Sequence, residues 1–189
     1  MRIIGGDLKG FNLFIPKDKN TRPLKDIARE SIFNLLTHSK KIFCKFEKSN
    51  ILDLYSGTGS FGLECLSRKA EKVFFVEKNK SAIQILKKNI DKLNFKKQTE
   101  VFCDDALQII QKQKISKIRF NIIFCDPPFK DMNIKKLLEL IYNKNLLVKN
   151  GTLILHRNKN NMETLPPNFK ALDERFYGVS KIIFGKFLY

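Results

Sequence analysis

The sequence of 189 residues is poor in histidine, cysteine and acidic groups: two, four and 19, respectively, against 36 lysines and arginines. No stretch approaches the ~18 apolar residues that span a bilayer, which excludes a membrane-spanning segment. The cysteines form no CxxC pair, and with two histidines they offer no zinc-ligand spacing. We therefore expect reduced, mostly buried thiols and no metal. Glycines and Asp7 interrupt the first apolar residues, so we expect no signal peptide and a cytosolic protein.

The shortage of acids leaves a net charge of +17, which either reflects composition alone or marks a basic surface. Residues 1–50 carry 11 basic and 5 acidic residues, 51–126 carry 14 and 9, and 127–189 carry 11 and 5. The acids gather in the middle, so both flanks present nearly uncompensated positive charge. This pattern favours a polyanionic partner, nucleic acid above all.

The first part of the chain is predicted to form a small extension. Two short strands at 2–4 and 11–15 surround glycines that permit positive φ, which indicates a hairpin. Arg22-Pro23 then opens a helix, because apolar residues recur at helical spacing from 24 to 36.

The rest of the chain alternates between apolar strands and amphipathic helices. Strands are expected at 51–54, 73–76, 99–103, 121–125 and 151–156. Helices are expected from 60, around 83–93, 107–110 and 137–141. Such alternation predicts an α/β fold: a Rossmann-like, mostly parallel, doubly wound sheet with its ligand at the carboxyl ends of the strands. Two further strands, at 169–172 and 181–188 around a turn at Tyr177-Gly178, are expected to close one edge in antiparallel fashion.

A glycine loop follows the first core strand. Gly57, Gly59 and Gly62 fit GxGxxG, which lets the backbone approach a ligand at a helix N-terminus. Glu77 ends the next strand, 20 residues after Gly57, where its carboxylate can accept both ribose hydroxyls of an adenosine. Nicotinamide dinucleotides and S-adenosylmethionine both satisfy this pattern.

Two further acids discriminate between these cofactors. Asp53 ends the strand before the loop, where it would repel a pyrophosphate but attract the α-ammonium group of S-adenosylmethionine. Asp105 follows the third strand and can accept a hydrogen bond from an adenine amino group. Asp105 is equally well explained as a helix N-cap, and acids that simply close strands are the alternative for Asp53 and Glu77.

The sequence Asp126-Pro127-Pro128-Phe129 follows the fourth core strand and is the most specific signal in the chain. The two prolines fix φ and lack N–H donors, so the turn offers carbonyl acceptors beside a carboxylate. Such a site suits an exocyclic amine, whose lone pair it would direct towards an electrophilic methyl group. Phe129 can stack on the ring that carries the amine. A strand-terminating turn with a buried Phe is the alternative, but it leaves the acid and both prolines unexplained.

These motifs resemble those of S-adenosylmethionine-dependent amino methyltransferases, in which a glycine loop precedes (D/N)PP(Y/F). The N-terminal part is similar to the small-subunit rRNA guanine-N2 methyltransferase family, RsmD. The resemblance covers essentially the whole chain and rests on Arg2-Ile3-Ile4-Gly5-Gly6, Lys9-Gly10, Leu13, Thr21-Arg22-Pro23, Arg29-Glu30, Phe33-Asn34-Leu35-Leu36, Glu64, Leu66-Ser67-Arg68 and Val76-Glu77. Leu24, Lys69 and Phe129 depart from the family's usual Thr, Gly and Tyr, and none of these changes removes a catalytic group.

The resemblance implies methylation of the N2 amino group of a guanine in 16S rRNA, within an assembled small-subunit particle. We expect a monomer, because no exposed apolar stripe beyond the core helices suggests a dimer face. Its expected catalytic residues are Asp126, Pro127, Pro128 and Phe129, with Asp126 and the Pro127 carbonyl orienting the amine. Its expected cofactor residues are Asp53, Tyr55, Ser56, Gly57, Gly59, Glu77, Lys78, Asp105, Ala106 and Asp126. Its expected RNA-binding residues are Arg2, Lys9, Thr21, Arg22 and Arg29, as phosphate binders. Residues 1–45 would form the RNA-contacting extension and 46–189 the catalytic domain.

Three other functions compete with this interpretation. A DNA adenine-N6 or cytosine-N4 methyltransferase could use the same motif, but no target-recognition domain is visible. A protein glutamine methyltransferase normally carries Asn where Asp126 stands. A non-catalytic RNA-binding assembly factor with this fold would not need an intact Asp126-Pro127-Pro128-Phe129 motif.

Overall fold

The computed structural model describes residues 1–16, 26–42 and 44–189. A seven-stranded sheet with the order β3-β2-β1-β4-β5-β7-β6 forms the centre of these residues. Its strands are β1 (Asn50–Leu54), β2 (Lys72–Glu77), β3 (Thr99–Cys103), β4 (Phe120–Cys125), β5 (Leu147–Asn158), β6 (Phe169–Tyr177) and β7 (Ser180–Phe187). The helices are α1 (Asp26–His38), α2 (Ser60–Ser67), α3 (Lys80–Lys92), α4 (Ala106–Ile109), α5 (Gln113–Ser116) and α6 (Ile134–Asn143), with a 3-10 turn η1 (Lys96–Gln98).

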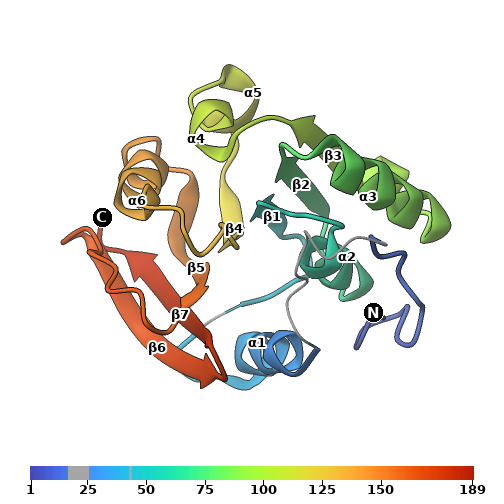
Figure 1. Ribbon diagram of the computed structural model, residues 1–189, viewed down its shortest axis with the longest axis horizontal. Coiled ribbons are helices and arrows are strands. Elements are labelled where there is room, and N and C mark those ends of the chain that lie inside the picture. Colours follow the sequence, from blue (N-terminus) through green and yellow to red (C-terminus); the bar gives the residue numbers. More distant parts are fainter. Residues whose placement is uncertain (17–25, 43) are drawn as a thin grey trace.

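The two faces of the sheet carry separate apolar cores because side chains alternate along each strand. In β4, Ile122 and Phe124 belong to the core beneath α1, α2 and α3, whereas Ile123 and Cys125 belong to the core beneath α4, α5 and α6. Figure 1 shows these two helical layers on opposite sides of the sheet. The strands from β3 to β5 are parallel, and β7 pairs antiparallel with both β5 and β6. The predicted doubly wound fold is confirmed.

The N-terminal segment packs on α2 through two buried side chains of that helix. Glu64 accepts a hydrogen bond from the Ile4 N–H at 2.7 Å, and the Ser67 hydroxyl donates to the Gly5 carbonyl at 2.7 Å. Gly6 has φ +75°, and a Cβ there would lie 1.9 Å from the Ser67 carbonyl oxygen. The Gly5-Gly6 and Glu64–Arg68 sequence motifs therefore dock this segment on the domain.

Several boundaries differ from the sequence predictions. The expected hairpin is short: its two arms form one antiparallel bridge, Arg2 to Asn12, flanked by hydrogen bonds from the Ile3 N–H to the Phe11 carbonyl and from the Leu13 N–H to the Met1 carbonyl. Strand β6 extends beyond 169–172 because its antiparallel pairing with β7 continues to Tyr177. Strand β5 extends beyond 151–156 at both ends: Leu147 pairs with Phe120 of β4, and Arg157 and Asn158 pair with β7. The short helix α5 was not predicted. The expected helix start at Arg22-Pro23 lies outside the described residues.

Two expectations from composition can be compared with the structure. No helix within the described ranges is long and apolar enough to cross a membrane. All four cysteines are free: Cys65 and Cys125 are buried, Cys44 is half-buried and Cys103 is exposed, so burial of the thiols is less complete than predicted.

Candidate active site

The candidate residues converge where the order of the sheet reverses. Strand β1 pairs with β2 on one side and β4 on the other, so the chain winds in opposite directions from β1 and β4. The ends are tied together: Ser56 N–H donates to the Val76 carbonyl at 3.0 Å, and Asp126 N–H donates to the Leu54 carbonyl at 3.3 Å. A crevice at such a reversal is where doubly wound sheets bind ligands.

The three glycines of the loop are required for different reasons. A Cβ on Gly59 would lie 2.3 Å from Leu86 Cδ1, and one on Gly62 would lie 2.4 Å from Phe75 Cε1, so both permit close packing inside the protein. Gly57 has φ +55°, and a Cβ there would meet no atom of the described residues within 4 Å. Gly57 is therefore the glycine whose backbone faces open space that a ligand can occupy.

Glu77, at the end of β2, holds the loop in this conformation. Its Oε2 accepts a hydrogen bond from the Gly57 N–H at 2.9 Å, and its Oε1 accepts from the Asn79 N–H at 2.8 Å. Each carboxylate oxygen has a second lone pair, so Glu77 can still accept hydroxyl donors. One side chain thus links the open glycine to the predicted ribose position.

Asp53 is a buried carboxylate beneath the loop. Its Oδ2 accepts a hydrogen bond from the Gly62 N–H at 3.1 Å, whereas its Oδ1 is buried without a partner among the described residues. Burial raises the pKa of Asp53 well above its ordinary value, and the like charges of Asp126 and Glu77 raise it further against the Gly62 hydrogen bond. A ligand cation beside Asp53 would favour the ionised form of this carboxyl group and would offset the repulsion from Asp126 and Glu77.

The other predicted cofactor residues lie around the same strand ends. Asp105 is the N-cap of α4, and its side chain accepts a hydrogen bond from the Leu107 N–H at 2.9 Å. Ala106, the first residue of α4, is buried, and Lys78 is exposed. Tyr55 has φ +61°, and its half-buried hydroxyl lies 3.4 Å from Asp131 Oδ2. Burial is the largest cause that raises the pKa of Tyr55, followed by the charge of Asp131.

Asp126 begins the turn after β4 and contacts the end of β5. Its Oδ1 lies 2.7 Å from Nδ1 of His156, a residue that is 6% exposed. The rings of Phe129 and His156 meet edge to face, with centroids 5.4 Å apart and planes at 78°. Pro127 is buried and Pro128 is exposed, so the two prolines meet different surroundings.

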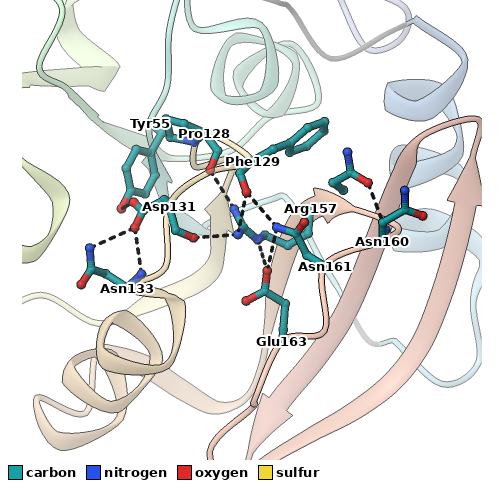
Figure 2. A network of polar contacts seen from close by, with 10 residues as sticks. Tyr55, Pro128, Phe129, Asp131, Asn133, Arg157, Asn160, Asn161 and Glu163 are labelled. Carbon is teal, nitrogen blue, oxygen red and sulfur yellow. Dashed lines mark hydrogen bonds and ion pairs between the residues drawn. The ribbon is translucent and has the colours of Figure 1, made fainter.

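Arg157 organises the rest of this turn, as Figure 2 shows. Its fully buried guanidinium donates to the carbonyl oxygens of Pro128 at 2.9 Å, Phe129 at 3.2 Å and Asp131 at 2.7 Å. The charge of Arg157 is paired with Glu163. Five donors in a planar fork suit this convergence of acceptors, which sets the path of residues 128–131.

Comparisons with known proteins identify the family of this chain. Residues 1–186 match the family described as "Conserved hypothetical protein 95". The chain belongs to this family. It is 32% identical over 180 residues to the "Ribosomal RNA small subunit methyltransferase D" of Haemophilus influenzae, covering 95% of this chain and 90% of the relative. The predicted similarity to the RsmD family is therefore confirmed.

Solved structures share the fold of this family member. The Escherichia coli protein described as "Putative methyltransferase yhhF" superimposes with a TM-score of 0.83 at 26% identity, covering 99% of this chain and 97% of that one. The more distant SMU.776, solved in complex with SAH, has a TM-score of 0.64 at 14% identity, covering 80% of this chain and 48% of that one. The sheet and these neighbours show a Rossmann-like class I methyltransferase fold.

The residues that the family resemblance assigned to RNA separate into three groups. Arg2 and Lys9 are exposed on the N-terminal segment. Arg29 is fully buried, donates to the Arg2 carbonyl at 2.5 Å and pairs with Asp26 at 3.0 Å. A phosphate cannot reach a side chain in this position, so the expectation for Arg29 is corrected to a structural role. Thr21 and Arg22 lie outside the described residues.

His156 and Arg157 were not assigned a role from the sequence. His156 was expected only as the last residue of a strand, and Arg157 was one basic residue among many. The sequence gives only a weak signal for either residue. Both lie near the end of β5, and only the pairing of β4 with β5 shows that they reach the DPPF turn. The described ranges contain no group of three or more His, Cys, Asp or Glu arranged to hold a metal ion.

Proposed function

We propose that this protein transfers a methyl group from S-adenosylmethionine to the exocyclic N2 amino group of a guanine in 16S rRNA. The observation that carries the proposal is the position of Asp126. Asp126 is the first residue of the two-proline turn that follows β4. Because β4 pairs with β1, this turn lies beside the glycine loop that follows β1. The family relatives named as small-subunit rRNA methyltransferases support an rRNA substrate.

The residues at the strand ends fit S-adenosylmethionine. The open space above Gly57 admits a ligand close to the backbone, and Glu77 has acceptor capacity for ribose hydroxyls. The unpartnered Oδ1 of Asp53 and its carboxylate neighbours favour a cationic ligand such as an α-ammonium group. When bound, this cofactor supplies an electrophilic methyl group on a sulfonium.

The protein's own contribution is to position and polarise the amine. Asp126 accepts a hydrogen bond from the guanine N2 amino group, and the Pro127 carbonyl accepts a second one, so that the nitrogen lone pair points out of the ring plane. Phe129 stacks on the base. Guanine N2 is a weak nucleophile, so positioning, worth ~7 to 11 kcal/mol in favourable cases, dominates the rate acceleration. The acceptors also stabilise the positive charge that develops on nitrogen.

We further propose that residues 1–45 are an RNA-contacting extension of the catalytic domain formed by residues 46–189. Exposed Arg2 and Lys9 would bind phosphates, and Arg22 is proposed to do so from its sequence context alone. The substrate would be 16S rRNA within an assembled small-subunit particle, which the enzyme would meet as a monomer in the cytoplasm.

Tritium transfer from labelled S-adenosylmethionine tests the proposal with three acceptors: naked 16S rRNA, small ribosomal subunits and duplex DNA. We expect label in the subunits, at guanine N2 after nuclease digestion. Asp126→Ala is expected to abolish transfer while the affinity for SAH, measured by calorimetry, stays within about threefold, because Asp126 acts on the amine. Glu77→Ala is expected to weaken SAH binding.

Each alternative gives a different outcome. Label in DNA would support an adenine-N6 or cytosine-N4 methyltransferase. Subunit binding without transfer to any acceptor would support an assembly factor. Full activity of Asp126→Ala would exclude the role given to this carboxylate.

A further inference from the structure

We propose that His156 is a positioning residue for methyl transfer, which fixes both the Asp126 carboxylate and the Phe129 ring. The inference rests on the proposed function, because these two groups are the ones that would contact the guanine. No residue of the DPPF motif itself explains why either side chain keeps one orientation.

The register of the sheet brings His156 to this position. Cys125 on β4 pairs with Leu155 on β5, so the next residue of each strand, Asp126 and His156, also lie at neighbouring positions. The two side chains meet at 2.7 Å between Oδ1 and Nδ1. A freely rotating surface carboxylate would present either oxygen in many directions, whereas this contact selects one rotamer.

The contact also assigns the proton of the imidazole. An ionised Asp126 can only accept, so Nδ1 of His156 must carry the hydrogen. In a neutral imidazole Nε2 is then the unprotonated nitrogen, and it is buried without a hydrogen-bond partner among the described residues. The bond engages Oδ1 of Asp126 and leaves Oδ2 as the oxygen that accepts from the substrate amine.

The imidazole of His156 also contacts the ring of Phe129, the residue proposed to stack on the base. Phe129 is half-buried, and its ring meets His156 edge to face at 5.4 Å. Edge-to-face pairs hold an aromatic ring in a defined plane. His156 thus sets the angle between the amine acceptor and the stacking plane, which the geometry of methyl transfer requires.

Two substitutions separate positioning from packing. Asn places an amide nitrogen close to the position of Nδ1, so His156→Asn keeps a donor to Asp126. Leu fills a similar volume without a donor, so His156→Leu removes the hydrogen bond. Small subunits lacking the modification are the acceptor, and kcat and KM are measured for each variant.

We expect His156→Leu to lower kcat by about 10- to 100-fold, because misplacing a reacting group by an ångström costs about that much. KM for subunits and Kd for SAH should change by no more than about threefold, since His156 touches neither phosphate nor cofactor. His156→Asn should recover kcat to within about fivefold of the wild type. Equal kcat values for wild type and His156→Leu, or equal losses in both variants, would overturn the proposal.

A second measurement does not depend on activity. The chain has two histidines, so ring ¹⁵N NMR spectra are assigned by comparison with His38→Asn. We expect His156 to carry its proton on Nδ1 and to lose this preference in Asp126→Ala. A proton on Nε2, or a spectrum unaffected by Asp126→Ala, would overturn the assignment. If the wild type methylates no subunit, the proposed function fails, while this spectrum still decides whether His156 orients Asp126.

Discussion

The side-chain amide of Asn89 holds the backbone of Phe14 through two hydrogen bonds. Asn89 Oδ1 accepts from the Phe14 N–H at 2.7 Å, and Nδ2 donates to the Phe14 carbonyl at 3.1 Å. The second hydrogen of Nδ2 is donated to the Thr58 carbonyl, in the glycine loop, at 3.1 Å. One buried residue of α3 therefore connects the N-terminal segment to the candidate cofactor site.

Asn89→Ala is expected to lower the free energy of unfolding by about 1 to 3 kcal/mol, because buried backbone groups lose their partners. SAH affinity should fall as well, since the loop at Thr58 loses an anchor. Urea unfolding and calorimetry measure both effects. Lys88→Ala, at the exposed neighbouring position, is the control and should stay within about 0.5 kcal/mol of wild type. An Asn89→Ala protein as stable as this control would refute the linkage.

Alanine at Gly57 is predicted to impair mainly SAH binding, and alanine at Gly62 mainly stability. Gly57→Ala places a methyl group in open space, so SAH affinity should fall, while the left-handed backbone costs about 1 to 2 kcal/mol of stability. Gly62→Ala overpacks against Phe75 and should cost about 1 to 3 kcal/mol with a smaller effect on affinity. Calorimetry with SAH and thermal unfolding compare the two variants. Unchanged SAH binding by Gly57→Ala would place the ligand elsewhere.

The sequence predicted what depends on local pattern. Every core strand of the doubly wound sheet was expected, because buried parallel strands are short apolar runs, and Asp53, Glu77 and Asp126 were found as acids at strand ends. Contacts between distant residues were not predictable. Arg157 lies 29 residues from Pro128, and Arg29 lies 27 residues from the Arg2 carbonyl to which it donates a hydrogen bond. The family resemblance suggested phosphate binding for Arg29, and the sequence does not reveal which basic side chains face the interior.

Arg157→Met is expected to lower the free energy of unfolding by about 3 to 5 kcal/mol, because Glu163 loses its partner and three carbonyls lose a donor. Arg157→Lys retains the charge but cannot reach all three carbonyls, so its loss should be intermediate. Arg175→Met, which breaks a more exposed ion pair with Asp173, is the matched control. Chemical denaturation measures all three variants, and equal stability of Arg157→Met and Arg175→Met would exclude the bracing role.

Because Asp53 is buried, its titration should make the free energy of unfolding depend on pH. Its pKa is raised in the folded state above its unfolded value of about 4, so the folded protein binds more protons between these two values. Stability therefore falls as pH rises from about 4 through the raised pKa. Asp53→Asn removes this titration and keeps an acceptor for the Gly62 N–H. The stability of Asp53→Asn relative to wild type should increase over this pH range in urea unfolding, and a constant difference would contradict the burial argument.

Arg2 and Lys9 should determine part of the salt dependence of RNA binding. If each neutralises one phosphate, Arg2→Ala/Lys9→Ala should reduce the slope of log K against log salt by about 1.5. Affinity should fall by a similar factor for different rRNA fragments, because phosphate contacts carry no base specificity. Filter binding at several KCl concentrations measures the slope.

Lys135→Ala/Lys136→Ala removes the same number of charges and is the matched control for this double variant. Both lysines are exposed near the start of α6, on the opposite helical layer from the N-terminal segment in Figure 1, so their loss should leave the slope unchanged. A general effect of net charge would reduce the slope in both proteins. If both variants behave alike, the basic surface attracts RNA as a whole, and the N-terminal segment has no special place in the interface.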